Sequence, residues 1–300
     1  MVINLLHLTT LGSGLKMWTE KYRPNNLSEI VGHMEFFPIW DKWVENKDLP
    51  HLIISGPAGI GKTTLGVVLA KEILEDDFAL NFLELNASDD RKLEVVRTKI
   101  KGFATTRKMG FAPFKICLLD EMDGMTNDAQ NALKRIMEKY SANVRFVITT
   151  NYLHKIVAPI QSRCVVQKLG LVDKYAIRGL LSTINDVEGG QEREIDVIST
   201  FANGDVRKAI SMLENGNNES EDNSDYFNIL TSNKDEMLDK LQELITKGTS
   251  ITEVCRGLHD AVIDNDIESK FKYLRVIGEL EYRSPTITPR IGISWLVSQV

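Results

Sequence analysis

A glycine-rich segment beginning at residue 56 has the residue types and spacing of a phosphate-binding loop. GPAGIGKTT satisfies G-x-x-x-x-G-K-[ST], between the apolar run LIIS and an apolar-periodic stretch that predicts a helix. Glycines let backbone N–H groups surround phosphate oxygens, and the helix N-terminus adds partial positive charge. We expect Lys62 to reach the β- and γ-phosphates and the Thr63 hydroxyl to hold magnesium. The loop residues expected to bind nucleotide are Gly56, Pro57, Ala58, Gly59, Ile60, Gly61, Lys62, Thr63 and Thr64.

Polar side chains end two further apolar runs. Asp120 and Glu121 follow KICLL, and Asn151 ends VITTN. Since parallel sheets bind ligands at the carboxyl ends of their strands, we expect these groups beside the phosphate loop. Asp120 would contact magnesium through its water shell, and Glu121 would orient and polarise the attacking water. The amide of Asn151 would position a water or sense the γ-phosphate. Together these residues predict hydrolysis of a nucleoside triphosphate.

The elements that position these residues alternate between strand and helix patterns. The runs LIIS, FLELN, KICLL, VRFVIT and CVVQ read as buried strands, which predicts a parallel α/β sheet. In 127–140 the apolar residues recur every three or four positions, with Thr126 as N-cap. Beyond about residue 171 only helical patterns remain, near 173–184, 193–202 and 205–214. The predicted boundaries are an N-terminal extension at 1–16, an α/β domain at 17–170, a helical lid at 171–214, an acidic linker at 215–233 and a helical domain at 234–300.

Composition limits the classes of protein that this chain could be. Its 300 residues are 43% hydrophobic, and no stretch reaches the roughly 18 apolar residues of a membrane span. The three cysteines have no CxxC spacing and the five histidines no metal-like spacing, so neither a disulfide framework nor a zinc site is predicted. The net charge is −6, but residues 91–108 hold seven basic side chains and one acid. That stretch could contact a polyanion.

An ordered series of segments resembles one family. MWTEKYRP, EIVGH, PHLIISGPAGIGKTT, LELNASDDR, LLDEMDGMTNDAQNAL, NYLHKIVAPIQSRC and NGDVRKAI, over residues 17–214, are similar to the small subunits of the replication factor C clamp loader, which are AAA+ ATPases. Such a series is far more specific than a phosphate loop alone. The resemblance implies an AAA+ P-loop parallel-sheet domain, then a small helical lid domain and an all-α C-terminal collar domain for oligomerisation.

The resemblance also implies roles that spacing alone could not assign. Arg163, in QSRC, would be an arginine finger that acts in trans on the ATP of a ring neighbour. Arg207, in GDVRKAI, would reach the γ-phosphate from the lid. Cys164 is expected to be a buried strand residue rather than a nucleophile. The expected adenine-pocket residues are Tyr22, Arg23, Pro24, Val31 and Gly32.

Two further contact surfaces follow from the resemblance. The expected DNA-backbone contacts are Arg91, Arg97, Lys101 and Thr126, and the expected clamp contacts are Met109 and Phe111, with core packing of those two apolar side chains as the alternative. Two residues depart from the family pattern. Lys92 stands where glycine is common, and Met122 stands where alanine is usual.

The resemblance therefore implies an ATP- and magnesium-dependent clamp-loader small subunit. Its partners would be a large subunit and further small subunits in a pentameric ring, a sliding clamp of the PCNA type and primer-template DNA, with no membrane partner and a cytoplasmic or nuclear location. Two alternatives are another AAA+ DNA-acting ATPase, of the Holliday-junction helicase or replication-initiator type, and a subunit that binds ATP only as a switch.

Overall fold

The computed structural model describes residues 17–87, 94, 96–189, 195–216, 222–265, 267, 269–284 and 286–300. The chain divides into two compact units between Gly216 and Asn217. Each unit is described separately below. The expected N-terminal extension at 1–16 lies outside the described residues.

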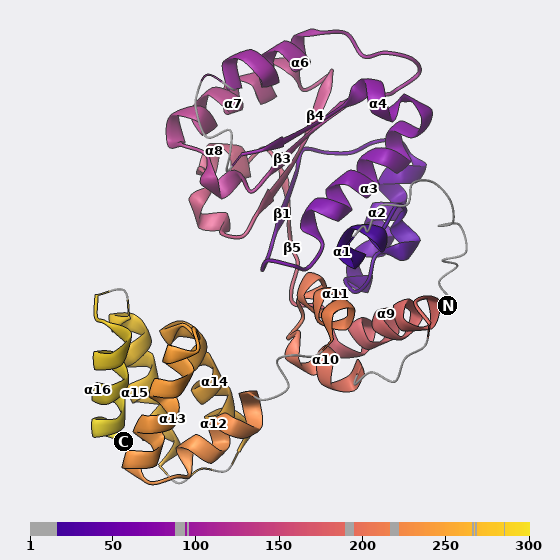
Figure 1. Cartoon of the computed structure of the whole chain (residues 1–300). Helices are drawn as coiled ribbons and strands as arrows, with labels where there is room; N and C mark the ends of the chain where they lie inside the picture. The colour runs from indigo at the N-terminus through magenta and orange to yellow at the C-terminus, as the bar shows by residue number, and fades with distance from the viewer. Residues whose placement is uncertain are drawn as a thin grey trace. The chain divides into compact units, whose positions relative to one another are not determined.

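A five-stranded parallel sheet forms the centre of the first unit (Figure 1). The strands lie in the order β2-β3-β4-β1-β5, and every neighbouring pair is parallel. All five strands coincide with predicted ones to within a residue at most ends, so the predicted parallel α/β sheet is confirmed. The strands are β1 Leu52–Ser55, β2 Phe82–Asn86, β3 Lys115–Asp120, β4 Val144–Thr150 and β5 Val165–Lys168.

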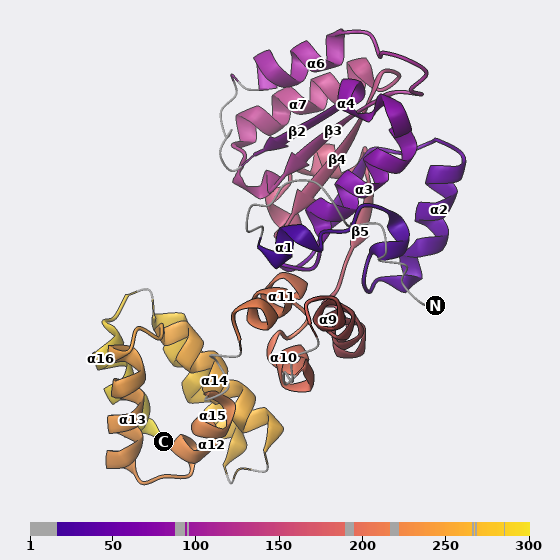
Figure 2. The same ribbon diagram turned by 45° about the vertical axis from the view of Figure 1, so that its right-hand side comes forward.

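Helices cover both faces of this sheet (Figures 1 and 2). Leu52 and Ile54 of β1 belong to a hydrophobic cluster with α2 and α3, whereas Ile53 belongs to a second cluster with α6, α7 and α8. This alternation follows from the two-residue period of a strand, and burial of both faces explains the unbroken apolar runs. The helices around the sheet are α1 Trp18–Lys21, α2 Phe37–Glu45, α3 Lys62–Leu74, α4 Phe78–Asn81, α6 Lys101–Thr105, α7 Asn127–Tyr140 and α8 Ala158–Gln161, with a π-helical turn at Val96–Ile100.

Three further helices form the lid of the first unit: α9 Lys174–Val187, α10 Ile195–Phe201 and α11 Val206–Asn215. Their apolar faces, with Ile177, Leu181 and Leu213, belong to the same hydrophobic cluster as α2 and α3. The lid and the sheet thus share one continuous core. The predicted division of this unit at residue 170 stays a prediction.

The second unit consists of helices: α12 Asp222–Leu230, α13 Lys234–Thr246, α14 Ile251–Asp264, α15 Lys270–Arg283 and α16 Pro289–Gln299. The prediction of a linker over all of 215–233 is wrong, because α12 occupies much of it. Tyr226, Ile229 and Leu230 of α12 are buried in the core of the unit. Acidic and amide residues surround these three apolar positions in the sequence, so the composition of the segment predicted a linker instead of an amphipathic helix. The sequence pattern also left α16 unassigned.

No helix among the described residues is long and apolar enough to cross a membrane.

Gly257 is expected to be essential for packing α14 against α12. A Cβ atom there would lie 2.2 Å from Cε2 of the buried Tyr226 ring. We expect Gly257→Ala to lower the free energy of unfolding by about 2 kcal/mol, because the ring must move in a filled core. The matched control is Gly278→Ala on α15, where a Cβ meets nothing within 4 Å. That variant should be neutral or gain up to about 1 kcal/mol. Urea unfolding followed by circular dichroism measures both, and equal effects would contradict the packing explanation.

Candidate active site

The phosphate loop connects the end of β1 to the start of α3. Gly59 and Gly61 adopt positive φ values of 75° and 91°, which residues with a side chain rarely adopt. Gly61 is the N-cap of α3, and its carbonyl accepts from the Leu65 N–H. The backbone N–H groups of the first helical turn therefore face the loop, as an anion site requires.

Lys62 is enclosed at this loop, with 8% of its surface exposed. Its Nζ donates to Gly56 O at 2.9 Å, Pro57 O at 2.5 Å and Asn151 Oδ1 at 2.7 Å. Burial lowers the pKa of the ammonium, whereas nearby carboxylates, Asp120 first, raise that pKa. The contact brings together two predicted residues, Lys62 at the start of α3 and Asn151 directly after β4. It also gives the ammonium acceptors that a bound phosphate could replace.

Asp120 links the phosphate loop to two strands. Its Oδ1 accepts hydrogen bonds from Thr63 Oγ1 at 2.6 Å and from Thr149 Oγ1 at 2.5 Å. Glu121 follows with φ 53°, an unusual backbone conformation for a non-glycine residue, and its N–H donates to Thr149 Oγ1 at 3.0 Å. The Glu121 side chain is exposed to solvent. The structure thus places an accessible carboxylate next to a hydrogen-bonded one, as the two predicted roles require.

The sequence analysis missed a third carboxylate, that of Asp123. Its Oδ1 accepts from Thr150 Oγ1 at 2.9 Å and from the Asn151 N–H at 3.1 Å, which ties the turn after β3 to the end of β4. The signal was present in the sequence, since Asp123 comes three residues after Asp120. A short 3₁₀ turn at Met122–Gly124 directs the later residue back toward the site.

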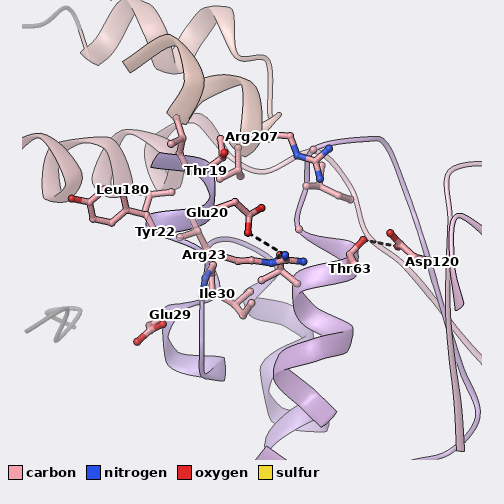
Figure 3. Close-up of a pocket in the computed structure, with 18 of the residues that line it drawn as sticks. Thr19, Glu20, Tyr22, Arg23, Glu29, Ile30, Thr63, Asp120, Leu180 and Arg207 are labelled. Atoms are coloured by element: carbon pink, nitrogen blue, oxygen red, sulfur yellow. Dashed lines mark hydrogen bonds and ion pairs between the residues drawn. The ribbon is translucent and has the colours of Figure 1, made fainter. Parts of the chain in front are cut away.

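A cavity of about 300 Å³ lies beside this loop, between the N-terminal segment and the lid (Figure 3). Of the residues predicted to bind nucleotide, those that line it are Tyr22, Arg23, Pro24, Val31, Gly59, Ile60, Gly61, Thr63, Thr64 and Arg207, together with the predicted metal ligand Asp120. The predicted residues outside its lining are Gly32, Gly56, Pro57, Ala58, Lys62, Glu121, Asn151 and Arg163. Gly32 instead packs against Val172, leaving room for no Cβ.

Apolar residues of the lid also line the cavity, and the sequence analysis missed them. Leu180 of α9 and Val206 and Ile210 of α11 line it together with Ile30. In sequence these are ordinary apolar positions of amphipathic helices, so no local signal separates them from core residues.

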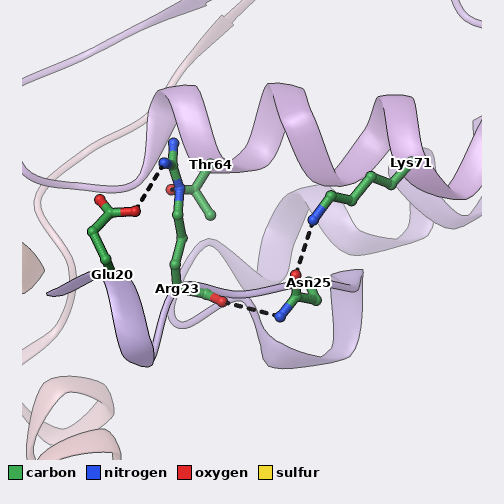
Figure 4. A network of polar contacts seen from close by, with 5 residues as sticks. All are labelled: Glu20, Arg23, Asn25, Thr64 and Lys71. Atoms are coloured by element: carbon green, nitrogen blue, oxygen red, sulfur yellow. Dashed lines mark hydrogen bonds and ion pairs between the residues drawn. The ribbon is translucent and has the colours of Figure 1, made fainter. Parts of the chain in front are cut away.

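Arg23 is held against the first turn of α3 (Figure 4). Its Nε donates to Thr64 Oγ1 at 3.3 Å, and its guanidinium forms an ion pair with Glu20 at 3.4 Å. Lys71 Nζ donates to Asn25 Oδ1 at 2.9 Å, further along the same helix. These contacts hold the N-terminal segment alongside α3 at the cavity wall.

The lid touches the phosphate loop through its last helix. The N–H groups of Val206 and Arg207 donate to Gly59 O at 3.1 and 3.3 Å. Asp205 is the N-cap of α11, and its Oδ1 accepts from the Lys208 N–H at 2.8 Å. Arg207 extends from this helix toward the end of α3 that carries Thr63 (Figure 3). The predicted lid arginine therefore does share the cavity with the phosphate loop.

Arg163 lies elsewhere on the first unit, in the turn between α8 and β5. It forms an ion pair with Glu138 of α7, and its NH1 donates to Pro159 O at 2.6 Å. The side chain keeps 32% of its surface exposed. It is thus ordered at the surface and does not line the cavity of its own chain. Beside it, burial raises the pKa of the Cys164 thiol to about 12, so this thiol stays protonated.

The residues predicted to contact DNA are only partly described. Arg91 lies outside the described residues, and Arg97 lies in the π-helical turn, with its side chain outside the description. Lys101 is exposed at the start of α6. Thr126 is exposed and is the N-cap of α7, where its side chain accepts from the Ala129 N–H at 3.4 Å. The predicted N-cap is confirmed.

Met109 and Phe111 stand out from a loop with a fixed backbone. The Met109 N–H donates to Asn81 Oδ1 at 2.8 Å, and the Phe111 N–H donates to Asp77 Oδ2 at 2.7 Å. The Phe111 side chain is fully exposed and that of Met109 half exposed. Core packing, the alternative for these two residues, is excluded.

No group of three or more potential metal ligands among His, Cys, Asp and Glu occurs in the part of the chain that the structure describes.

Comparisons with known proteins agree on the family. The family model "ATPase family associated with various cellular activities (AAA)" matches residues 52–169. The replication factor C small subunit of Methanococcus vannielii is 41% identical over 88% of this chain and 85% of its own length. That of Picrophilus torridus is 37% identical over 90% and 92%.

Solved structures with the same fold are more distant in sequence. The Thermotoga maritima RuvB P216G mutant superimposes with a TM-score of 0.56 at 15% identity, covering 92% of this chain and 91% of that one. A DNA polymerase III gamma subunit-related protein from the same organism gives 0.51 at 14% identity, covering 86% and 97%. These two likenesses support the fold alone.

Gly59 is expected to be needed for contact between lid and phosphate loop. A Cβ there would lie 1.9 Å from Asp205 Oδ1, in addition to its unfavourable positive φ. We expect Gly59→Ala to weaken MgADP binding at least about tenfold, because α11 must move from the cavity. Titration with a fluorescent ADP analogue measures the affinity. Gly102→Ala in α6, where a Cβ meets nothing within 4 Å, is the control. Wild-type affinity in Gly59→Ala would show that binding does not need this contact.

Proposed function

The chain belongs to the family of replication factor C small subunits, AAA ATPases that act in clamp loading during DNA replication, and from this premise we propose that its ATP site is completed by a neighbouring subunit. The ring would contain a large subunit and further small subunits, five in all. ATP binding would assemble the ring, open a PCNA-type sliding clamp and grip primer-template DNA, and hydrolysis would release both.

One observation carries this proposal: the phosphate loop, the adjacent ends of β3 and β4 and the cavity beside them bring together the expected groups of an ATPase site, and Arg163 is not among them. At the edge of the sheet Lys62 donates to Asn151, and the neighbouring Thr63 donates to Asp120. Arg163 is ordered by Glu138 and Pro159 at another surface of the same unit. A permanently charged, exposed guanidinium suits the charge that grows on γ-phosphate oxygens of a neighbour's ATP. In other phosphoryl-transfer systems such a residue contributes about 10³ to 10⁵ in rate.

In the proposed reaction, a water attacks the γ-phosphorus while the bond to the β-phosphate oxygen breaks. The exposed Glu121 carboxylate would accept a proton from that water, and Asn151 would hold the water in line. Lys62 would exchange the carbonyls of Gly56 and Pro57 for phosphate oxygens. Because the phosphates are anionic, this exchange also relieves the unfavourable burial of the ammonium.

Magnesium fits the oxygen ligands at the bottom of the site. The Thr63 hydroxyl and the Asp120 carboxylate lie 2.6 Å apart and offer the hard oxygen donors that this cation prefers. When bound there, magnesium would neutralise charge on the phosphates. Arg207 would add a further positive charge from the lid and would couple the γ-phosphate to lid closure.

The exposed side chains of Lys101, Met109 and Phe111 support the proposed partners. Lys101 would contact the DNA backbone without reading its sequence, and Arg91 and Arg97 are further candidates for such contacts. Met109 and Phe111 would meet the clamp, since exposed apolar side chains on a fixed loop suit a protein contact. We place the protein where genomic DNA is replicated, in the cytoplasm or a nucleus.

The fold alone would also suit a Holliday-junction motor, since a RuvB structure superimposes well. The higher identity to replication factor C small subunits favours clamp loading. A clamp pull-down and a strand-displacement assay separate the two functions, because a branch-migration motor needs no clamp.

Glu121→Gln is expected to separate binding from hydrolysis. The amide keeps the size of the side chain but cannot accept a proton, so ATPase activity with clamp and primed DNA should fall at least about 100-fold. The affinity for MgATP should stay within about threefold of wild type. The control is Glu75→Gln, an exposed carboxylate just beyond the far end of α3. Substantial remaining hydrolysis in Glu121→Gln would assign the catalytic base elsewhere.

Mixed rings test the action of Arg163 in trans. Lys62→Ala and Arg163→Ala should each be nearly inactive in assemblies made of one variant only. In mixed assemblies an intact Arg163 can serve a neighbour's intact Lys62 site, so part of the ATPase activity should return. If mixed rings demonstrably form, by mass spectrometry of two differently tagged chains, and no activity returns, the role in trans is wrong.

A further inference from the structure

A carboxylate of the lid contacts the N-terminal segment directly beside the cavity. Glu188 Oε1 accepts hydrogen bonds from the Tyr22 hydroxyl and from Lys21 Nζ, and it forms an ion pair with Lys21. Tyr22 is buried and lines the cavity, whereas Glu188 does not line it. The Glu188 side chain is 18% exposed. The Lys21 side chain is 41% exposed, so water screens the ion pair in part, whereas the hydrogen bond from the buried Tyr22 is better shielded.

The position of Glu188 makes this contact specific for the N-terminal segment. Glu188 is the C-cap residue of α9, at the negative end of the helix dipole. A carboxylate is unfavourable there, so it depends on the cation and hydroxyl that α1 and Tyr22 supply. Burial, and Glu188 itself, raise the pKa of Tyr22, which keeps the phenol protonated and able to donate. A second contact runs in parallel, since the Trp18 N–H donates to Glu214 Oε2 of α11 at 3.0 Å.

The lid is therefore attached to the rest of the first unit on both sides of the cavity. On the phosphate side, Val206 and Arg207 donate to Gly59 O. On the opposite side, Glu188 and Glu214 hold the segment of Trp18 to Tyr22. The cavity wall between them is shared by Tyr22 and lid residues such as Leu180. Without the second attachment, the shared hydrophobic core and the contacts at Gly59 would still hold the lid, and the cavity wall at Tyr22 would be the part left without a polar contact to it.

We propose that Glu188 is a positioning residue that controls nucleotide retention: by holding Tyr22 and Lys21, it keeps the lid closed over the nucleotide at the side away from the phosphates. This inference rests on the proposed nucleotide binding in the cavity, but not on ring assembly or on Arg163. Glu188 sets how long a nucleotide stays, and through this how fast a subunit can exchange ADP for ATP.

The test is the dissociation rate of a fluorescent ADP analogue, with magnesium, from the full-length chain in the presence of excess unlabelled ADP. Glu188→Gln should increase that rate about tenfold, since it loses charge-assisted hydrogen bonds to two partners. Tyr22→Phe, which removes only the hydroxyl, should increase it by a smaller factor. The two changes combined should give less than the product of their separate factors, because they share one hydrogen bond.

The matched control is Asp196→Asn. Asp196 also belongs to the lid and forms an ion pair, with Arg178 at 2.7 Å, but this pair is exposed and does not line the cavity. Asp196→Asn should release ADP at the wild-type rate. A thermal unfolding midpoint within a few degrees of wild type will show that each variant is folded.

Three results would overturn the inference. They are wild-type release from Glu188→Gln, equal acceleration by Asp196→Asn, and fully multiplicative effects of Glu188→Gln and Tyr22→Phe. A different result would refute the proposed binding site instead. In that case the wild-type chain fails to bind the analogue, or Lys62→Ala binds it with unchanged affinity.

Discussion

The parallel register of the sheet is the constraint on which the rest of the site depends. Because β1 lies between β4 and β5 and all strands run the same way, their carboxyl ends meet along one edge. Ser55 is level with Thr150, and Asn86 is level with Asp120. Residues at or just beyond the ends of separate strands, 29 and 57 positions apart in sequence, thus come within hydrogen-bond distance. The contact of Asp120 with both Thr63 and Thr149 is the direct result.

The acidic side chains at this edge offset part of the cost of burying the Lys62 ammonium. Burial disfavours the Lys62 ammonium, and the carboxylates of Asp120, Asp123 and Glu121 favour it. The ammonium is also hydrogen-bonded to two loop carbonyls and to Asn151. A site arranged in this way is prepared for an anion without leaving a buried charge unpaired. Such preorganisation lowers the reorganisation needed when phosphates bind.

The lid supplies a part of the cavity wall that lies beyond the phosphate loop. Its core is continuous with that of the sheet, and within the described residues polar contacts join it to the site at Gly59 and at the segment from Trp18 to Tyr22. Arg163 does not line the cavity of its own chain. In the proposed ATPase, Arg163 would therefore act on a site other than that of its own chain.

The sequence by itself determined the strands, the amphipathic helix at 127–140 and the chemistry of the phosphate loop, because each depends on neighbouring residues in a short segment. The residues whose spacing carried the prediction, Lys62, Thr63 and Asp120, do lie together. The segment around Tyr226 was predicted as a linker because its composition is acidic, although its apolar residues form a buried helix face. Only the tertiary structure decided that Asp123 holds the end of β4 and that Leu180 and Ile210 line the cavity. It alone decided that Glu188 meets Tyr22, 166 residues away in sequence. These contacts depend on how separate elements pack, and the pattern within any one element carries no record of its partner.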